Sequence, residues 1–197
     1  MATKLTREEW LIRCAAALSP HFKKAGYTLP KNIRMTCGLP SKGGFSQKKR
    51  TIGQCWPISA SADKTIEIFI SPTQDQPLEI AAILAHELVH ATVGNKEKHG
   101  KVFKACALAI GLEGKMTATS AGPDFVAWFK GAAKGMGKYH HAKMDYSKMP
   151  KQTTRMLKCS CPECESDGTP YIVRLSQSTL DRGAPICPVH EIEMAAA

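Results

Sequence analysis

The sequence predicts an α+β chain that consists of one medium-sized domain, a linker and a small C-terminal zinc ribbon. Helical and strand-like segments follow one another in residues 1–130, whereas Gly, Lys and Met are frequent in residues 131–155. Four of the eight cysteines lie between residues 159 and 187, inside the segment 156–197. With 197 residues, the chain is long enough for its first domain to bury a hydrophobic core.

The first domain is expected to open with an amphipathic helix that is followed by strands. Thr6 and Glu9 have the spacing of a capping box, and Gly26 provides a C-terminal stop. Strand-like patterns then predict three strands, at 32–38, 51–56 and 65–71. The third is the clearest, because isoleucine alternates with other residues along its whole length.

A buried helix is predicted next, over residues 78–93. Its side chains are apolar almost all round, Pro77 suits its first turn, and Gly94 suits its C-terminal cap. Buried polar groups are costly without partners, so the two histidines and two glutamates of this helix need an explanation. Two further helices are expected, at about 99–110 and at 124–130.

The buried helix carries the pattern H-E-x-x-H at His86, Glu87 and His90. Residues four apart lie one above the other on a helix, so the two histidines can share one zinc ion. Glu87 is rotated by about 100° from His86. Its carboxylate is therefore expected beside the metal, where it can act as the catalytic base on water at the zinc.

A catalytic zinc needs a third protein ligand, and His99 is the best candidate. The chain can reverse after Gly94, so that His99 is directed back at the preceding helix. Glu79, two turns before His86, and Glu97 are weaker candidates.

A second metal site is predicted in the C-terminal segment, where Cys161-x-x-Cys164 and Cys187-x-x-His190 form two knuckles. Three thiolates and one imidazole make a closed shell, so this zinc is expected to be structural. Such a short segment has too little core to fold unaided, and the metal would supply the missing stability. Cys159 is either a fifth candidate ligand or a spare thiol beside the knuckle.

The charge of the chain is unevenly distributed. The formal net charge is +10, and residues from 151 onward contain five basic and six acidic side chains. The first 150 residues therefore carry +11, which attracts polyanions, with nucleic acid as the default partner. The candidate contacts to DNA are the basic side chains of the Gly- and Lys-rich connection, namely Lys42, Lys48, Lys49 and Arg50.

A cytoplasmic protein without a membrane segment is expected. The sequence contains no run of 18 or more apolar residues, and its first ten residues have charges and no apolar stretch of a signal peptide. In a reducing compartment, clustered cysteines indicate a metal site rather than disulfides.

The stretch "HELVHATVGNKEKHGKVFKACALAIGL" resembles the SprT-like metallopeptidases, which are related to the Spartan DNA-dependent proteases. The likeness extends to the preceding helix and strands and to the zinc ribbon, and it is nearest to small SprT-like proteins of bacteria and phages. It implies a zincin-like fold, in which a small mixed sheet lies beside the active-site helix. It also implies peptide-bond hydrolysis, with Glu87 as the base and a zinc bound by His86, His90 and His99.

The ribbon departs from the pattern of this family in two ways. Its first knuckle continues as "CESDGTPY", which is longer than a compact turn, and its fourth ligand is His190 rather than a cysteine.

The sequence therefore predicts a zinc endopeptidase that acts on nucleic-acid-associated proteins, such as those crosslinked to DNA. An extended substrate is expected to pair with the strand at 65–71. Two alternatives are a nucleic-acid or RNA-polymerase adaptor whose zinc sites are both non-catalytic, and a peptidase for small peptides without a nucleic-acid role.

Overall fold

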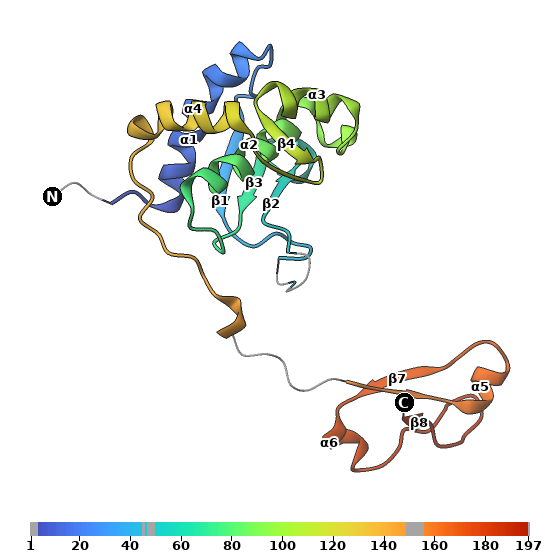
Figure 1. Cartoon of the computed structure of the whole chain (residues 1–197). Helices are drawn as coiled ribbons and strands as arrows, with labels where there is room; N and C mark the ends of the chain where they lie inside the picture. Colours follow the sequence, from blue (N-terminus) through green and yellow to red (C-terminus); the bar gives the residue numbers. More distant parts are fainter. Residues whose placement is uncertain (1–3, 45, 47–49, 149–155, 197) are drawn as a thin grey trace. The chain divides into compact units, whose positions relative to one another are not determined.

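The computed structural model describes residues 4–44, 46, 50–148 and 156–196. The chain divides into two compact units, Met1–Ser147 and Lys148–Ala197. Within the described residues, six α-helices and three small sheets make a mixed α+β fold (Figure 1). None of the described helices has the length and apolar composition needed to cross a membrane.

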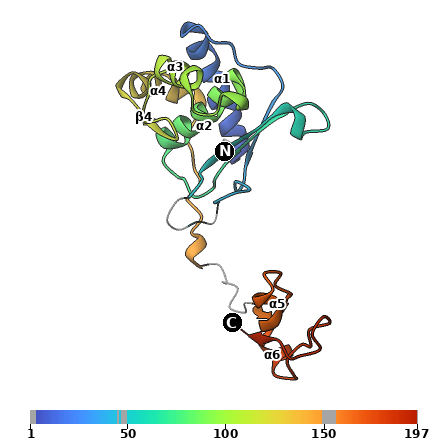
Figure 2. The same ribbon diagram turned by 90° about the vertical axis from the view of Figure 1, so that its right-hand side faces the viewer.

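The first unit contains a three-stranded sheet with the order β1-β3-β2. Its strands are β1 (Ile33–Cys37), β2 (Gly53–Trp56) and β3 (Ile66–Ile70). Strand β1 runs parallel to β3, and β2 runs antiparallel to it. The β2–β3 hairpin, teal in Figure 2, projects from the helices and carries the 3₁₀ turn η1 (Ile58–Ala60).

The position of β3 corrects one expectation about substrate binding. Because β3 is hydrogen-bonded on both sides, it offers no free edge to an extended peptide. The edge strand of this sheet that packs beside the predicted active-site helix is β2.

Four helices complete the core of the first unit: α1 (Arg7–Lys24), α2 (Pro77–Val93), α3 (Lys101–Ala109) and α4 (Pro123–Met136). The predicted capping box is confirmed, since Thr6 accepts from the Glu9 N–H and the Glu9 carboxylate accepts from the Thr6 N–H. Helix α2 begins with Pro77 and is capped by Gly94, whose φ is +91°.

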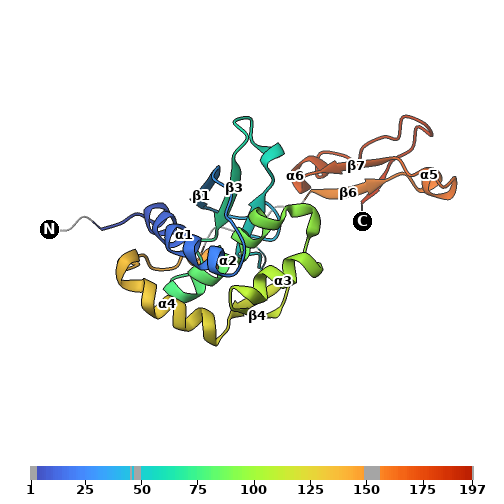
Figure 3. The same ribbon diagram turned by 90° about the horizontal axis from the view of Figure 1, so that it is seen from above.

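Helix α2 is the centre of this unit and packs against the sheet and the other three helices. Figure 3 shows it between the sheet and helices α3 and α4. Apolar side chains line nearly all of its circumference, as its composition predicts, and they meet one stripe of α1 and the rings of Phe103 and Phe125. Burial of this apolar surface is the main stabilising contribution to the first unit.

The first unit extends beyond residue 130, where the linker is expected to begin. Helix α4 continues to Met136, which is buried, and Gly137 then accepts a hydrogen bond of 3.0 Å from the Trp10 indole N–H. The guanidinium of Arg7 donates to the Ala142 carbonyl at 2.9 Å. These contacts attach the chain up to Ala142 to helix α1, and the 3₁₀ turn η3 (Tyr146–Lys148) follows at the boundary of the two units.

A hairpin of β4 (Leu112–Lys115) and β5 (Ala118–Ala121) follows α3 and was not expected from the sequence. Its strands are four residues long, and most of their side chains are exposed or half-buried. They therefore lack the regular apolar alternation by which strands are recognised.

The second unit is small and contains a three-stranded sheet with the order β7-β6-β8. Its elements are β6 (Leu157–Ser160), α5 (Pro162–Ser166), β7 (Ile172–Leu175), α6 (Gln177–Leu180) and β8 (Ala195–Ala196). The strand predicted between the two knuckles is confirmed as β7. The buried hydrophobic residues of the described part of this unit are four cysteines and one methionine.

Candidate metal centres and catalytic pocket

The structure brings the three predicted histidines of the first unit together. His86 and His90 lie one turn apart on α2, and His99 immediately precedes the N-cap of α3. Their ligand atoms all lie within 4.8 Å of one another, whereas neither Glu79 nor Glu97 belongs to this group.

Local backbone geometry returns His99 to the helix. Gly94 ends α2 with a positive φ, the 3₁₀ turn η2 (Asn95–Glu97) follows, and Lys98 also has a positive φ of +47°. The Asn95 amide donates a 2.7 Å hydrogen bond to the Cys55 carbonyl, so the turn is tied to strand β2. The chain is thereby reversed within five residues.

The three imidazoles fit a tetrahedral metal ion. The Nε2 atom of His99 lies 3.2 Å from the Nε2 atoms of both His86 and His90. Zn–N bonds of about 2.0–2.1 Å in a tetrahedron separate ligand nitrogens by about 3.3–3.4 Å. The group can therefore hold a metal ion and is compatible with zinc.

Burial keeps these imidazoles in the neutral form that binds metals. Burial, helped by the neighbouring histidines, lowers the pKa of His86 to about 3 and that of His90 to about 4. The Nδ1 atom of His86 lies 2.9 Å from the Thr119 hydroxyl on β5. With Nε2 directed at the group, Nδ1–H donates to Thr119, which fixes the tautomer and the ring orientation.

The ring of Phe103 on α3 packs against all three imidazoles. Its centroid lies 4.9 Å from that of His86, 4.5 Å from that of His90 and 4.9 Å from that of His99. Phe103 is fully buried, so it forms a rigid apolar wall behind the group.

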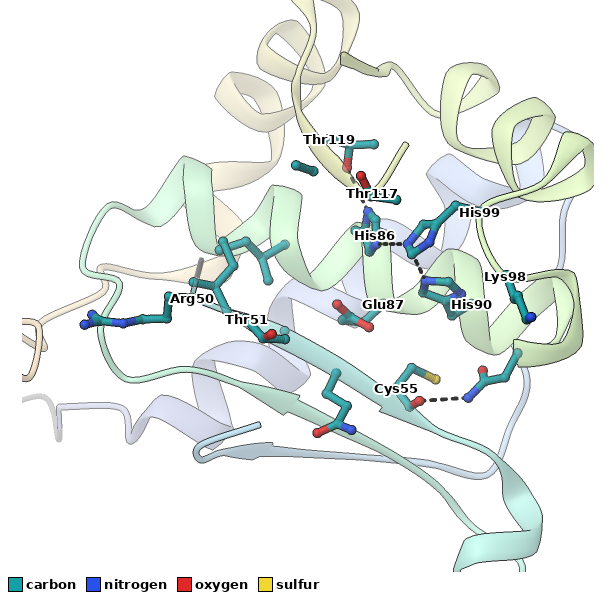
Figure 4. A pocket seen from close by; sticks show the side chains of 16 residues that line it. Arg50, Thr51, Cys55, His86, Glu87, His90, Lys98, His99, Thr117 and Thr119 are labelled. Carbon is teal, nitrogen blue, oxygen red and sulfur yellow. Dashed lines mark hydrogen bonds between the residues drawn. The ribbon is translucent and has the colours of Figure 1, made fainter. Parts of the chain in front are cut away.

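Glu87 lies beside the metal-binding group without belonging to it. Only 6% of its surface is exposed, although it carries a carboxyl group. Burial raises the pKa of Glu87 to about 8, and the backbone N–H of Cys55 opposes this shift. Figure 4 shows the carboxylate between the histidine rings and strand β2.

A pocket of about 830 Å³ opens over these residues. It is lined by β2 and the residues before it, by one face of α2, by the turn before α3 and by residues 117–119. The basic residues Arg50 and Lys98 line the pocket, and Figure 4 shows them at its opposite ends. A site with three protein ligands and an adjoining pocket leaves space for a substrate at the metal.

The predicted nucleic-acid contacts are only partly described by the structure. Lys42 and Arg50 are exposed, and the Arg50 guanidinium lies 5.8 Å from the centre of the Tyr146 ring. Lys48 and Lys49 lie outside the described residues.

In the second unit, Cys161, Cys164, Cys187 and His190 converge as one group. The Sγ atoms of Cys164 and Cys187 are 3.7 Å apart, and His190 Nδ1 lies 3.3 Å from Cys164 Sγ and 3.6 Å from Cys161 Sγ. Tetrahedral zinc with Zn–S bonds of about 2.3 Å separates two sulfurs by about 3.8 Å. This group, too, can hold a metal ion and is compatible with zinc.

Cys159 is not a member of this group. It lies on β6, is fully buried, and packs in the small core of the second unit. Its interpretation as a spare thiol is the one that agrees with the geometry.

The long first knuckle supplies a carboxylate to the histidine of the second group. Asp167, just after α5, has its Oδ2 atom 3.5 Å from His190 Nε2, on the ring edge opposite the thiols. The two unusual features of the ribbon sequence, the long knuckle and the histidine, are therefore in contact. Carboxylates in this position orient metal-binding imidazoles.

The two groups thus have donor sets and spacings that suit zinc, one with an open pocket and one closed by four ligands. No protein-family model, curated protein or solved structure matches this chain. Its resemblance to SprT-like metallopeptidases therefore stays a hypothesis based on sequence, and function is inferred from the chemistry of these side chains.

Proposed function

We propose that this protein is a zinc-dependent endopeptidase that acts on proteins associated with nucleic acid. The observation that carries the proposal is the convergence of His86, His90 and His99 in a pocket, with a buried carboxylate beside them. A purely structural zinc site does not need a buried Glu87, because the cost of burying that carboxyl group brings no compensating ligand bond.

Bound at the three histidines, zinc would act as a Lewis acid on the scissile carbonyl and on water. Glu87 would accept a proton from the attacking water and pass it to the leaving amine. Burial raises the pKa of Glu87, and a zinc ion beside it would oppose that shift, so the carboxylate could accept a proton from water and still release it to the amine.

Strand β2 is the proposed docking edge for the substrate backbone. It is the edge strand next to α2, and three of its four residues line the pocket. The outward backbone groups of Cys55 already contact Asn95 and Glu87, so an extended peptide would pair with those of Gly53, beside Glu87. This replaces the expected pairing with residues 65–71, whose backbone is already paired on both sides.

Charge supports the nucleic-acid part of the proposal. The first 150 residues carry a net +11, and two of the predicted DNA contacts, Lys42 and Arg50, are exposed. Since Arg50 also lines the pocket, nucleic acid bound there would hold its attached proteins close to Glu87. Binding of this kind weakens steeply as salt is raised.

The test compares wild type with Glu87→Gln on basic DNA-binding proteins, with and without single- and double-stranded DNA. Glu79→Gln is the matched control, because Glu79 is exposed on the same helix and outside the metal-binding group. We expect cleavage by wild type and by the control, enhanced by DNA, and none by Glu87→Gln, with equal zinc content in all three.

Cleavage that survives in Glu87→Gln would reject the assigned base. Cleavage that is indifferent to DNA would leave a peptidase without a nucleic-acid role. DNA binding with two tightly held zinc ions and no cleavage by any variant would establish the adaptor function instead.

A further inference from the structure

We propose that Gly53 is a positioning residue for Glu87, because its missing side chain creates the space that the carboxylate occupies. This inference rests on the proposed role of Glu87 as the base. Glycine in a strand interior weakens the strand and often marks a place where another group approaches the backbone closely. Gly53 opens strand β2, and it is one of the residues that line the pocket.

The backbone of Gly53 does not itself require glycine. Gly53 is not among the glycines with a positive φ, so an L-amino acid could adopt its conformation. Space is the limiting factor. A Cβ atom placed on Gly53 would overlap Glu87 Oε1 and would lie 3.0 Å from Glu87 Cδ and 2.8 Å from Ile83 Cγ2.

The alternation of β2 places the backbone groups of Gly53 and Cys55 at the edge of the strand that faces the pocket. The Ile52 carbonyl accepts from the Ser71 N–H on the side of β3, whereas the Cys55 carbonyl accepts from Asn95 on the other side. Residues 53 and 55 therefore direct their backbone groups away from β3, towards the pocket. In Figure 4, the Glu87 carboxylate lies above this edge of the strand.

A second contact from the same edge holds the carboxylate. The Cys55 backbone N–H donates a hydrogen bond to the Glu87 carboxylate. The carbonyl of the same residue is held by the Asn95 side chain at 2.7 Å, and Asn95 lies in the turn that leads to His99. The strand that fixes the base is thus also tied to the segment that carries the third histidine.

These contacts act on the position of the base, and they do not involve the histidines that would bind the metal. A methyl group at position 53 would displace the Glu87 carboxylate, and the three atoms nearest to the hypothetical Cβ belong to Glu87 and Ile83 rather than to a histidine. Gly53→Ala is therefore expected to retain zinc and lose turnover. Misplacement of a catalytic group by about 1 Å can reduce a rate about a hundredfold.

The experiment measures kcat, KM, zinc per chain and thermal midpoint for Gly53→Ala in the full-length protein. Gly131→Ala and Gly135→Ala are matched controls, since both glycines lie on α4 and an added Cβ meets no atom within 4 Å. We expect kcat to fall about a hundredfold in Gly53→Ala, with KM and zinc content nearly unchanged. Both controls should keep wild-type turnover.

A double-mutant cycle with Glu87→Ala then tests the contact itself. Without the carboxylate, a methyl group at position 53 loses its main obstacle, so Gly53→Ala should lower the thermal midpoint less in the Glu87→Ala background. If Gly53→Ala fails to fold alone, folding of Gly53→Ala/Glu87→Ala would support the same contact.

Three results would overturn the positioning role: wild-type turnover in Gly53→Ala, equal destabilisation in both backgrounds, or failure of both Gly53→Ala proteins to fold. The last two would assign the steric conflict to Ile83 instead. The cycle does not depend on catalysis. If wild type cleaves nothing, the proposed function fails, while the thermal midpoints still decide whether Gly53 makes room for Glu87.

Discussion

The two metal-binding groups differ in the structure that surrounds them. The three histidines lie on and beside a helix whose apolar side chains belong to a large hydrophobic core. In the described part of the second unit, three of the five buried hydrophobic residues are the cysteine ligands themselves. The first unit therefore has a scaffold that can form without its metal, whereas the metal group of the second unit is most of its core.

The same contrast appears in how open the two groups are. Three histidine ligands face a pocket of about 830 Å³, so a substrate can reach a metal held there. Three cysteines and one histidine complete a tetrahedron, which leaves no coordination position for a substrate. Ligand number and surroundings together support the proposal of catalysis at one group and structural support at the other.

Removal of metal is expected to produce the largest difference in stability between the two units. A strong chelator should unfold the second unit and leave the first folded, because structural zinc contributes about 10–16 kcal/mol of apparent binding free energy in small domains. The three tryptophans, Trp10, Trp56 and Trp128, all lie in the first unit. Tryptophan fluorescence during heating therefore reports the first unit alone, and resolved NMR signals report the second.

Matched variants apply the same test to each group separately. Cys164→Ser should abolish the ordered signals of the second unit, whereas His90→Ala should leave the tryptophan melting curve almost unchanged. Loss of the first unit's transition in His90→Ala would show that its fold, too, depends on metal, and the proposed contrast would be wrong.

Much of the first unit follows from local sequence patterns. The capping box at Thr6 and Glu9 and the glycine at position 94 define helix ends through short-range hydrogen bonds and backbone conformation. The order of the strands depends on pairing between distant segments, so the central position of β3 and the edge position of β2 could not be inferred from periodicity.

The candidate site shows the same division between local and distant information. His86 and His90 are four residues apart on one helix. A single turn that begins at Gly94 brings His99 back beside them. Thr119 is 33 residues from His86, and an isolated threonine in a short exposed strand has no distinguishing pattern. Gly53 is equally inconspicuous, because its role is visible only once the position of Glu87 is known.

A smaller effect is expected from the hydroxyl that orients His86. Thr119→Val keeps the shape of the side chain and removes the partner of His86 Nδ1. Loss of such a partner typically weakens metal binding about 10- to 100-fold. We expect this loss at the histidine group, measured by competition with a chromophoric chelator, and no change at the cysteine group.

Thr117→Val is the control for that variant. Thr117 lines the same pocket, but among the described residues it is Thr119 that hydrogen-bonds His86. An equal loss of zinc in both variants would assign the effect to the polarity of the pocket rather than to orientation of His86.

The smallest effect is expected at the corresponding contact of the second group. Asp167 lies 3.5 Å from His190 Nε2, but the Asp167 side chain is 67% exposed, so water competes for both partners. Exposed pairs of this kind contribute about 0.2–1 kcal/mol, which corresponds to about fivefold in affinity at most. Asp167→Asn should weaken zinc binding by no more than this, while Asp181→Asn, an exposed change in the same unit, should have no effect. A loss as large as that of Thr119→Val would mean that solvent does not screen this carboxylate, and the long knuckle would then be as important to its metal as strand β5 is to the histidines.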